Sequence, residues 1–179
     1  MAPMAVAPKG PQRAGNIAQD AMFAGLFAGA VMAIAETVVS WLALGDWVLP
    51  WRMFASIILG QSAVQGPFSV IQGVFGLLVH FALSVAFAVI WAAMVRHAPP
   101  DIRHSYAAHT AAAMIYGLIL WVVNFQLVAR VAYPWLLGTM DVAQLTIHAV
   151  AYGLPLGLFL TKRIAWMEPR RPVERQPTV

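Results

Sequence analysis

One apolar run limits what this chain can fold into more than any other feature of its sequence. From Gly73 to Val95 the chain carries a single titratable residue, His80. About 20 apolar residues in a helix cross a ~30 Å hydrocarbon core, so this run is long enough to span a membrane. The chain is 61% hydrophobic and only 10% charged, unlike an ordinary soluble domain. We therefore predict a polytopic membrane protein.

The 179 residues have room for one membrane bundle and for no separate soluble domain. We predict an all-α fold, a bundle of four transmembrane helices within residues 17–163. A flexible cytoplasmic tail at 1–16 precedes it, and a basic cytoplasmic tail at 164–179 follows it. The chain has no cysteine, which excludes disulfides, thiolate metal sites, iron–sulfur clusters and covalent haem attachment. The expected spans are about 21–44, 68–95, 107–128 and 142–161.

Two short aromatic segments separate the spans on the outer side, at 45–67 and 129–141. Each is too short to cross the membrane, so we expect interfacial helices there. Their indole rings and arginines suit the headgroup region, where such side chains are favoured. The expected interfacial residues are Trp51, Arg52, Arg130 and Trp135.

The two halves of the chain resemble each other. A Pro-Trp pair, at Pro50 and again at Pro134, follows the first span of each half, and the second span carries His-x-x-x-Ser or His-x-x-x-Tyr. With two spans per half, both halves have the same orientation. The implied symmetry axis lies along the membrane normal, as in parallel-repeat transporters.

The distribution of lysine and arginine predicts the orientation, because cytoplasmic loops carry an excess of both. Only Arg52 and Arg130 fall on the side of the interfacial segments. Both termini should therefore be cytoplasmic. The basic character of the chain follows from this topology and from attraction to anionic lipid, so we expect the bilayer and no nucleic acid as its partner. The cytoplasmic set is Lys9, Arg13, Arg96, Arg103, Lys162, Arg163, Arg170, Arg171 and Arg175.

Small residues indicate where helices pack. In the first span, Gly25 and Gly29 share one stripe with Ala33, Glu36 and Ser40, and this stripe should face protein. A second pair, Gly153 and Gly157, lies roughly opposite His148 on the fourth span. We expect that pair to pack against a neighbour outside the bundle, in a homo-oligomer or a larger membrane complex.

Three titratable residues on three spans lie at one depth when the rise of 1.5 Å per residue is counted from the cytoplasmic side. They are Glu36, His80 and His148, in the outer half of the bundle. Asn124 should be at or slightly outside this layer, with Ser84 and Tyr152 one turn nearer the cytoplasm. His109, near the cytoplasmic end of its span, is expected to be an interfacial residue.

This layer has several interpretations. Its members could merely hydrogen-bond to one another and specify helix packing. They could hold a b-type haem between His80 and His148, with space at Gly73, Gly76 and Ala88 and with Arg52 and Arg130 at the propionates.

They could also move protons or cations, with Ser84, Tyr152 and His109 or His104 continuing the path inward. A divalent metal on His80, His148 and Glu36 is a variant of this interpretation. We expect no enzyme, because the G-x-S-x-G, H-E-x-x-H, Walker and dinucleotide motifs are all missing.

The H-x-x-x-S and H-x-x-x-Y-G-x-x-x-G helices, preceded by A-G-x-x-A-G-x-x-M from Ala24 to Met32, carry a resemblance. From about Ala21 to Leu160 the chain resembles small uncharacterised bacterial inner-membrane proteins with four spans. The resemblance implies the bacterial cytoplasmic membrane and supplies no activity. The sequence thus predicts a small transporter-like or accessory subunit with a buried His/Glu centre.

Overall fold

The computed structural model describes residues 17–137 and 141–167, and every regular element within these ranges is helical. The two predicted tails, 1–16 and most of 164–179, lie outside the described residues. The last helix continues to Met167, a few residues beyond the expected end of the bundle at 163.

Four helices are long and apolar enough to cross a membrane, and each overlaps one expected span. The first two are α1 (Ile17–Leu44) and α3 (Val70–Val95). The third is built from α5 (Tyr106–Trp121), the π-helix η2 (Val122–Ala129) and α6 (Arg130–Ala132). The fourth is built from α7 (Asp141–Thr146), the π-helix η4 (Ile147–Gly153) and α8 (Leu154–Met167).

The connections contain short helices. Between α1 and α3 lie α2 (Leu49–Leu59) and the 3₁₀ turn η1 (Gln61–Val64). The other two short helices are α4 (Pro100–His104), which precedes α5, and the 3₁₀ turn η3 (Pro134–Leu136), which follows α6.

Local sequence sets where these helices begin and end. Ser69 and Gln72 form a reciprocal capping box at the start of α3, which satisfies two backbone N–H groups that the helix leaves open. Ser105 caps α5 by accepting from the N–H of Ala108 at 3.2 Å. Gly60 ends α2 at φ 85°, a backbone conformation that side chains disfavour.

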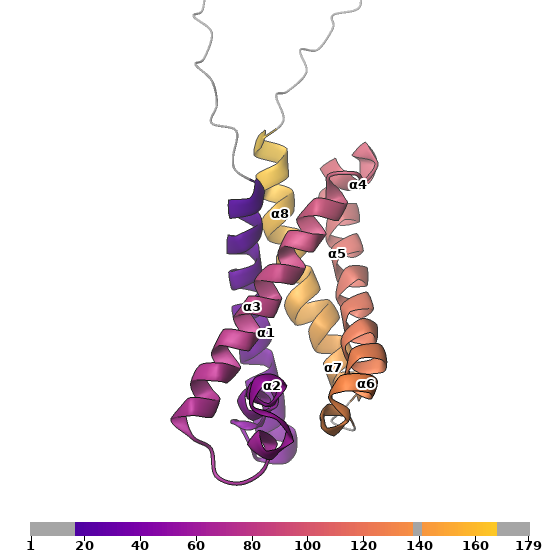
Figure 1. Ribbon diagram of the computed structural model, residues 1–179. Coiled ribbons are helices and arrows are strands. Elements are labelled where there is room, and N and C mark those ends of the chain that lie inside the picture. Colours follow the sequence, from indigo (N-terminus) through magenta and orange to yellow (C-terminus); the bar gives the residue numbers. More distant parts are fainter. Residues whose placement is uncertain (1–16, 138–140, 168–179) are drawn as a thin grey trace, which may run out of the picture.

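The helices form two groups that lie side by side (Figure 1). α1 packs on α3, which also carries α2, while α5 packs on η4 and α8. Contacts of α1 with η4 and α8 join the groups. α1 begins and α8 ends at the same end of the bundle, which we call the terminal end; the opposite end is the α2 end.

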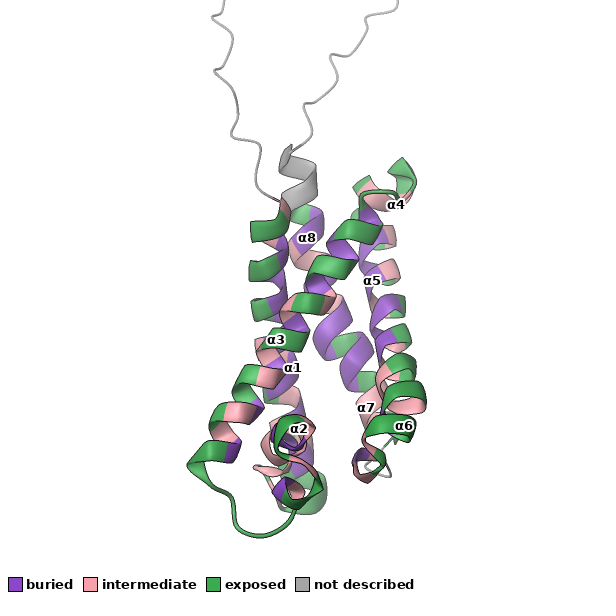
Figure 2. Ribbon diagram, in the orientation of Figure 1, coloured by how far each residue is buried: buried purple, intermediate pink, exposed green. Residues whose placement is uncertain are grey.

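The apolar core lies toward the terminal end, where buried residues from all four long helices meet (Figure 2). Alanines allow the helices to approach closely there, and larger side chains fill the centre. This part of the bundle is closed by close packing. The core includes Ala21, Ala24, Ala28, Ala88, Trp91, Ala92, Val95, Ala113, Leu156 and Leu160.

Glycines make the closest helix contacts. A Cβ added to Gly25 would stand 2.7 Å from Val85 Cα, and one on Gly29 would stand 2.7 Å from Ser84 Oγ. The stripe predicted on α1 is therefore buried against α3, and Glu36 and Ser40 are buried with it.

The second glycine pair packs differently from the prediction. A Cβ on Gly153 would stand 2.5 Å from the carbonyl oxygen of Ala113, and one on Gly157 would stand 2.8 Å from Thr110 Cα. Both partners belong to α5 of the same chain. The expectation of a contact outside the bundle was wrong, because the missing side chains make room for a neighbouring helix of the bundle itself.

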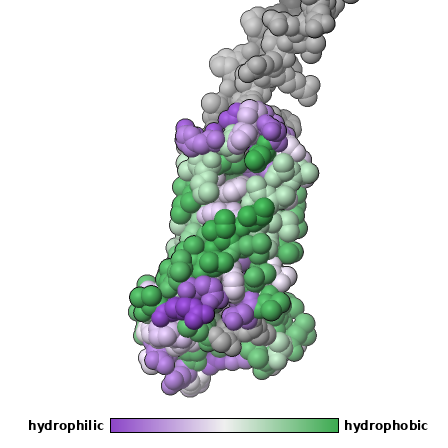
Figure 3. Space-filling model, turned by 90° about the vertical axis from the view of Figure 1, so that its right-hand side faces the viewer, coloured by the Kyte–Doolittle hydropathy of each residue, from purple (hydrophilic) through white to green (hydrophobic). Residues whose placement is uncertain are grey.

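The outer surface of the bundle is apolar around its middle. Large side chains such as Phe27, Ile34, Leu78 and Ile119 are exposed along the long helices. Figure 3 shows hydrophobic residues covering the middle of one face, with hydrophilic residues gathered at the top and in the lower part. Such a belt would be unfavourable in water and is what a lipid-facing surface requires.

Candidate functional site

A cavity of about 300 Å³ lies between the two helix groups, in the half of the bundle toward the α2 end. Its wall is mostly apolar and includes Met32, Phe54, Leu83 and Phe125. All six residues predicted to form the buried centre line it: Glu36, His80, Ser84, Asn124, His148 and Tyr152. The tertiary structure therefore brings the predicted set to one cavity, from α1, α3, η2 and η4.

Tyr152 and Ser84 mark the side of the cavity that faces the closed core. The Tyr152 hydroxyl donates to the carbonyl oxygen of Ser84 across 2.6 Å, which links η4 to α3. The Ser84 hydroxyl itself donates to the carbonyl of His80 at 2.8 Å. Both hydroxyls therefore donate to backbone carbonyls within the protein.

Glu36 is the acidic residue of the cavity. Its side chain is only 5% exposed, and neither carboxyl oxygen hydrogen-bonds to any residue that the structure describes. Its Oε2 atom is fully buried without a partner. A buried carboxyl without partners is costly inside a membrane protein.

His80 has one ring nitrogen fixed by the backbone. Its Nε2 lies 2.9 Å from the carbonyl oxygen of Gly29 on α1. A carbonyl can only accept, so Nε2 carries the hydrogen, and in the neutral ring Nδ1 carries the lone pair. The rings of Phe54 and Phe81 stand edge-on to the imidazole, with centroids 4.7 and 5.2 Å away.

His148 on the fourth span also has one ring nitrogen fixed by the backbone, but the two nitrogens exchange their roles. Its Nδ1 donates to the carbonyl of Gln144 at 2.8 Å, which leaves the lone pair of the neutral ring on Nε2. Phe125 stands edge-on to it, with centroids 5.7 Å apart. Neither His80 Nδ1 nor His148 Nε2 has a hydrogen-bond partner among the described side chains and backbone. Each imidazole therefore keeps one unused acceptor.

Two π-helical segments contribute to the wall of the cavity from the second helix group. η2 supplies Asn124 and Phe125, and η4 supplies His148 and Tyr152. π-turns are rare and are frequently found at functional sites. The residue spacing did not predict these segments. Gln144, whose buried Oε1 also lines the cavity and has no partner within the described part of the chain, was not among the predicted site residues.

His109 lies elsewhere and differs from its prediction. It is fully buried in the core near the terminal end, whereas the sequence predicted an interfacial position. Its Nε2 accepts from the indole N–H of Trp91 at 3.4 Å, and the two rings stand edge to face. The side chain therefore faces the inside of the bundle, a burial that the sequence did not predict.

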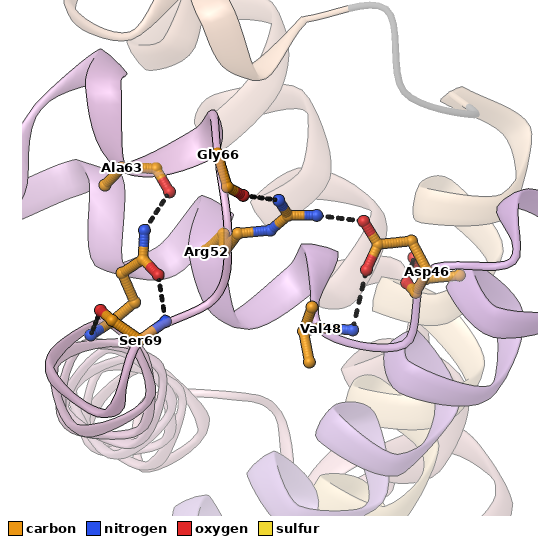
Figure 4. A network of polar contacts seen from close by, with 8 residues as sticks. Asp46, Val48, Arg52, Ala63, Gly66 and Ser69 are labelled. Carbon is orange, nitrogen blue, oxygen red and sulfur yellow. Dashed lines mark hydrogen bonds and ion pairs between the residues drawn. The ribbon is translucent and has the colours of Figure 1, made fainter.

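The predicted interfacial residues take part in contacts within the protein. Arg52 forms an ion pair with Asp46 and donates to the carbonyl of Gly66 at 2.9 Å (Figure 4). Trp135 donates to the buried hydroxyl of Ser56 on α2 at 3.0 Å, which bridges the two helix groups at the α2 end. Arg130 bonds Gln126 on its own helix.

The space expected for a porphyrin is filled by protein. A Cβ on Gly76 would stand 2.5 Å from the carbonyl oxygen of Trp51, and one on Gly73 would meet Phe68 at 3.2 Å. Ala88 is packed against Gly25. Arg52, expected at the propionates, is committed to Asp46 and Gly66. The haem interpretation was therefore wrong about where its space lay, and we do not propose haem.

The geometry also excludes the interpretation in which His80, His148 and Glu36 bind one divalent metal ion. Across residues 17–137 and 141–162, no three histidine or carboxylate side chains come close enough together to hold a metal ion. Glu36, His80 and His148 share the cavity without converging on one point. The prediction of a three-residue metal site was wrong, because sequence spacing gives depth along a helix and not distance across the cavity.

The fold and its apolar surface identify a multi-pass helical membrane protein with a polar centre in an internal cavity. No family model, curated protein or solved structure matches the chain.

Proposed function

We propose that this protein is a small transporter-like inner-membrane protein in which Glu36, His80 and His148 bind and release protons or cations. The observation that carries the proposal is the cavity that all three line, with the Glu36 carboxyl left without a partner among the described residues. Ionisable groups inside a membrane bundle are costly and usually mark an ion or proton pathway.

The imidazoles support the proposal through their fixed tautomers. Each donates one N–H to a backbone carbonyl, which orients the ring and leaves the other nitrogen to accept a proton or bind a cation. The unused acceptors of the two rings both belong to residues that line one cavity.

The shape of the bundle supports access from one side. The cavity lies toward the α2 end, while the terminal end is closed by the alanine-rich core. With both termini in the cytoplasm, as the positive charges predict, the cavity lies nearer the outer side, and the close-packed core separates it from the cytoplasm. The repeat proposed for the two halves, related along the membrane normal, would allow them to rock against each other and expose the cavity in turn.

The test is proton movement in proteoliposomes that contain a pH-sensitive dye. We expect an imposed cation or potential gradient to drive dye-reported proton flux with the natural protein. Glu36→Gln and the triple variant Glu36→Gln, His80→Asn, His148→Asn should abolish it, because amides do not titrate near neutral pH. The exposed His97, replaced by asparagine, is the matched control and should leave the flux unchanged.

Assembly is judged in the same samples by thermal unfolding. The amide variants keep hydrogen-bonding capacity, so the helices should stay assembled while the flux is lost. If the triple variant retains the full flux, the three residues serve only to specify packing and the proposal fails. The formation of a dimer or a larger complex stays a prediction. The contact between subunits would have to lie away from Gly153 and Gly157, which pack against α5 of the same chain.

A further inference from the structure

We propose that the cavity binds a lipophilic ammonium ion, a small apolar molecule that carries a protonated amine. The inference rests on the proposed function, because it names the cation that the Glu36 site would take. It starts from the cavity's size and wall. About 300 Å³ lies at the lower end of small-molecule pockets. A path for protons alone needs a chain of polar groups and water, and does not need an apolar cavity of molecular size.

The hydrogen-bonding groups at the cavity include four unpaired acceptors. They are Glu36 Oε2, Gln144 Oε1, His80 Nδ1 and His148 Nε2, none of which has a partner in the described part of the chain. All four accept when the two rings are neutral and the carboxyl is ionised, and the amides of Asn124 and Gln144 add N–H donors. A buried acceptor left unpaired costs free energy, so the site favours a ligand that brings donors.

Charge selects among such ligands. Among the described residues, those that line the cavity include one carboxyl group and no lysine or arginine. A carboxylate or phosphate ligand would meet Glu36 without a compensating cation, and a neutral alcohol would form no ion pair with it. An ammonium group pairs with Glu36 and still has N–H bonds for Gln144 or an imidazole. The charge therefore favours a cation with donors.

The aromatic side chains favour the same ligand. Phe54, Phe87, Phe125 and Tyr133 line the cavity, and Phe54 and Phe125 stand beside the two imidazoles. Aromatic faces attract cations within about 6 Å, most strongly in a desolvated site. Their apolar surface also buries the carbon skeleton of the ligand. Because one carboxylate cannot hold a proton and an ammonium ion at once, binding would couple the ligand to proton release.

Four probes that share one phenylbutyl group test the inference: the primary ammonium, the trimethylammonium, the alcohol and the carboxylate. Binding to the full chain in lipid nanodiscs is measured by titration calorimetry, and empty nanodiscs correct for partition into lipid. We expect saturable binding of the primary ammonium at least about 10-fold tighter than that of the alcohol or carboxylate. The trimethylammonium, which has no N–H, should bind with intermediate affinity.

Variants assign the binding to this cavity. Glu36→Gln should weaken the primary ammonium at least about 10-fold, while His97→Asn should leave it unchanged. Gln144→Leu provides a second variant in case Glu36→Gln does not fold, and should weaken the ammonium more than the trimethylammonium. Equal affinity for the alcohol, no saturable binding, or binding insensitive to both variants overturns the inference.

The outcomes separate this inference from the proposed function. Proton flux without ammonium binding leaves the function standing and removes the ligand class. Ammonium binding without any proton or cation flux supports the ligand class and removes the transport function.

Discussion

The carbonyl oxygen of His148 lies 2.2 Å from where a Cβ on Gly117 would stand. Among the described glycines, this is the shortest distance from an added Cβ to a neighbouring atom. α5 and η4 therefore touch backbone to backbone at the level of the site. The glycine thereby sets where His148 sits relative to the cavity.

Replacing Gly117 by alanine should push η4 away from α5. We expect the free energy of unfolding to fall by about 1–3 kcal/mol, the usual cost of overpacking, in spite of alanine's better helix propensity. Gly73→Ala is the matched control, because its new methyl would meet only the far end of the Phe68 side chain at 3.2 Å. Thermal unfolding in detergent measures both. If the Gly117 variant is as stable as the Gly73 variant, the helices are not held together at this contact.

Arg52 should matter more for stability than Arg130. Arg52 ties together three parts of the α2 end, through Asp46 and the carbonyl of Gly66, and its side chain is 13% exposed. Arg130 bonds only Gln126, on its own helix and exposed. We expect Arg52→Met to cost about 1–3 kcal/mol and Arg130→Met less than ~0.5 kcal/mol.

Chemical unfolding of the two variants under the same conditions tests this difference. The Arg52 variant should also expose residues 60–69 to proteolysis, since the link to Gly66 is lost. Equal stability of the two variants would mean that the Asp46–Arg52–Gly66 network contributes nothing to the free energy of unfolding.

Topology is the third prediction. A reporter fused after Val179 should be active only as a cytoplasmic reporter, and one inserted near Gln61 should report the outer side. The physical reason is the excess of lysine and arginine on the side of the termini, which leaves only Arg52 and Arg130 on the other. A C-terminal reporter active outside the cytoplasm would reverse the orientation and place the cavity on the inner side.

By itself, the sequence determined the class of fold and the depth of the site. Long apolar runs must become helices in a membrane, because every backbone N–H and C=O has to be satisfied within the segment. Residue spacing along a helix gives depth directly, so Glu36, His80 and His148 could be assigned to one layer before any packing was known. The stripe of Gly25 and Gly29 pointed inward for the same reason.

Only the tertiary structure decided which helix faces meet, and therefore the lateral distances. Gly153 and Gly157 could serve an internal or an external neighbour with the same sequence, and the structure places α5 there. The tautomers of the two imidazoles depend on carbonyl groups, one from the same helix and one from another. The π-turns that aim His148 and Asn124 at the cavity have no signal in residue spacing. The contact of the two glycines with α5 and the bond between His80 and Gly29 join segments far apart in the chain, which periodicity along one helix does not encode.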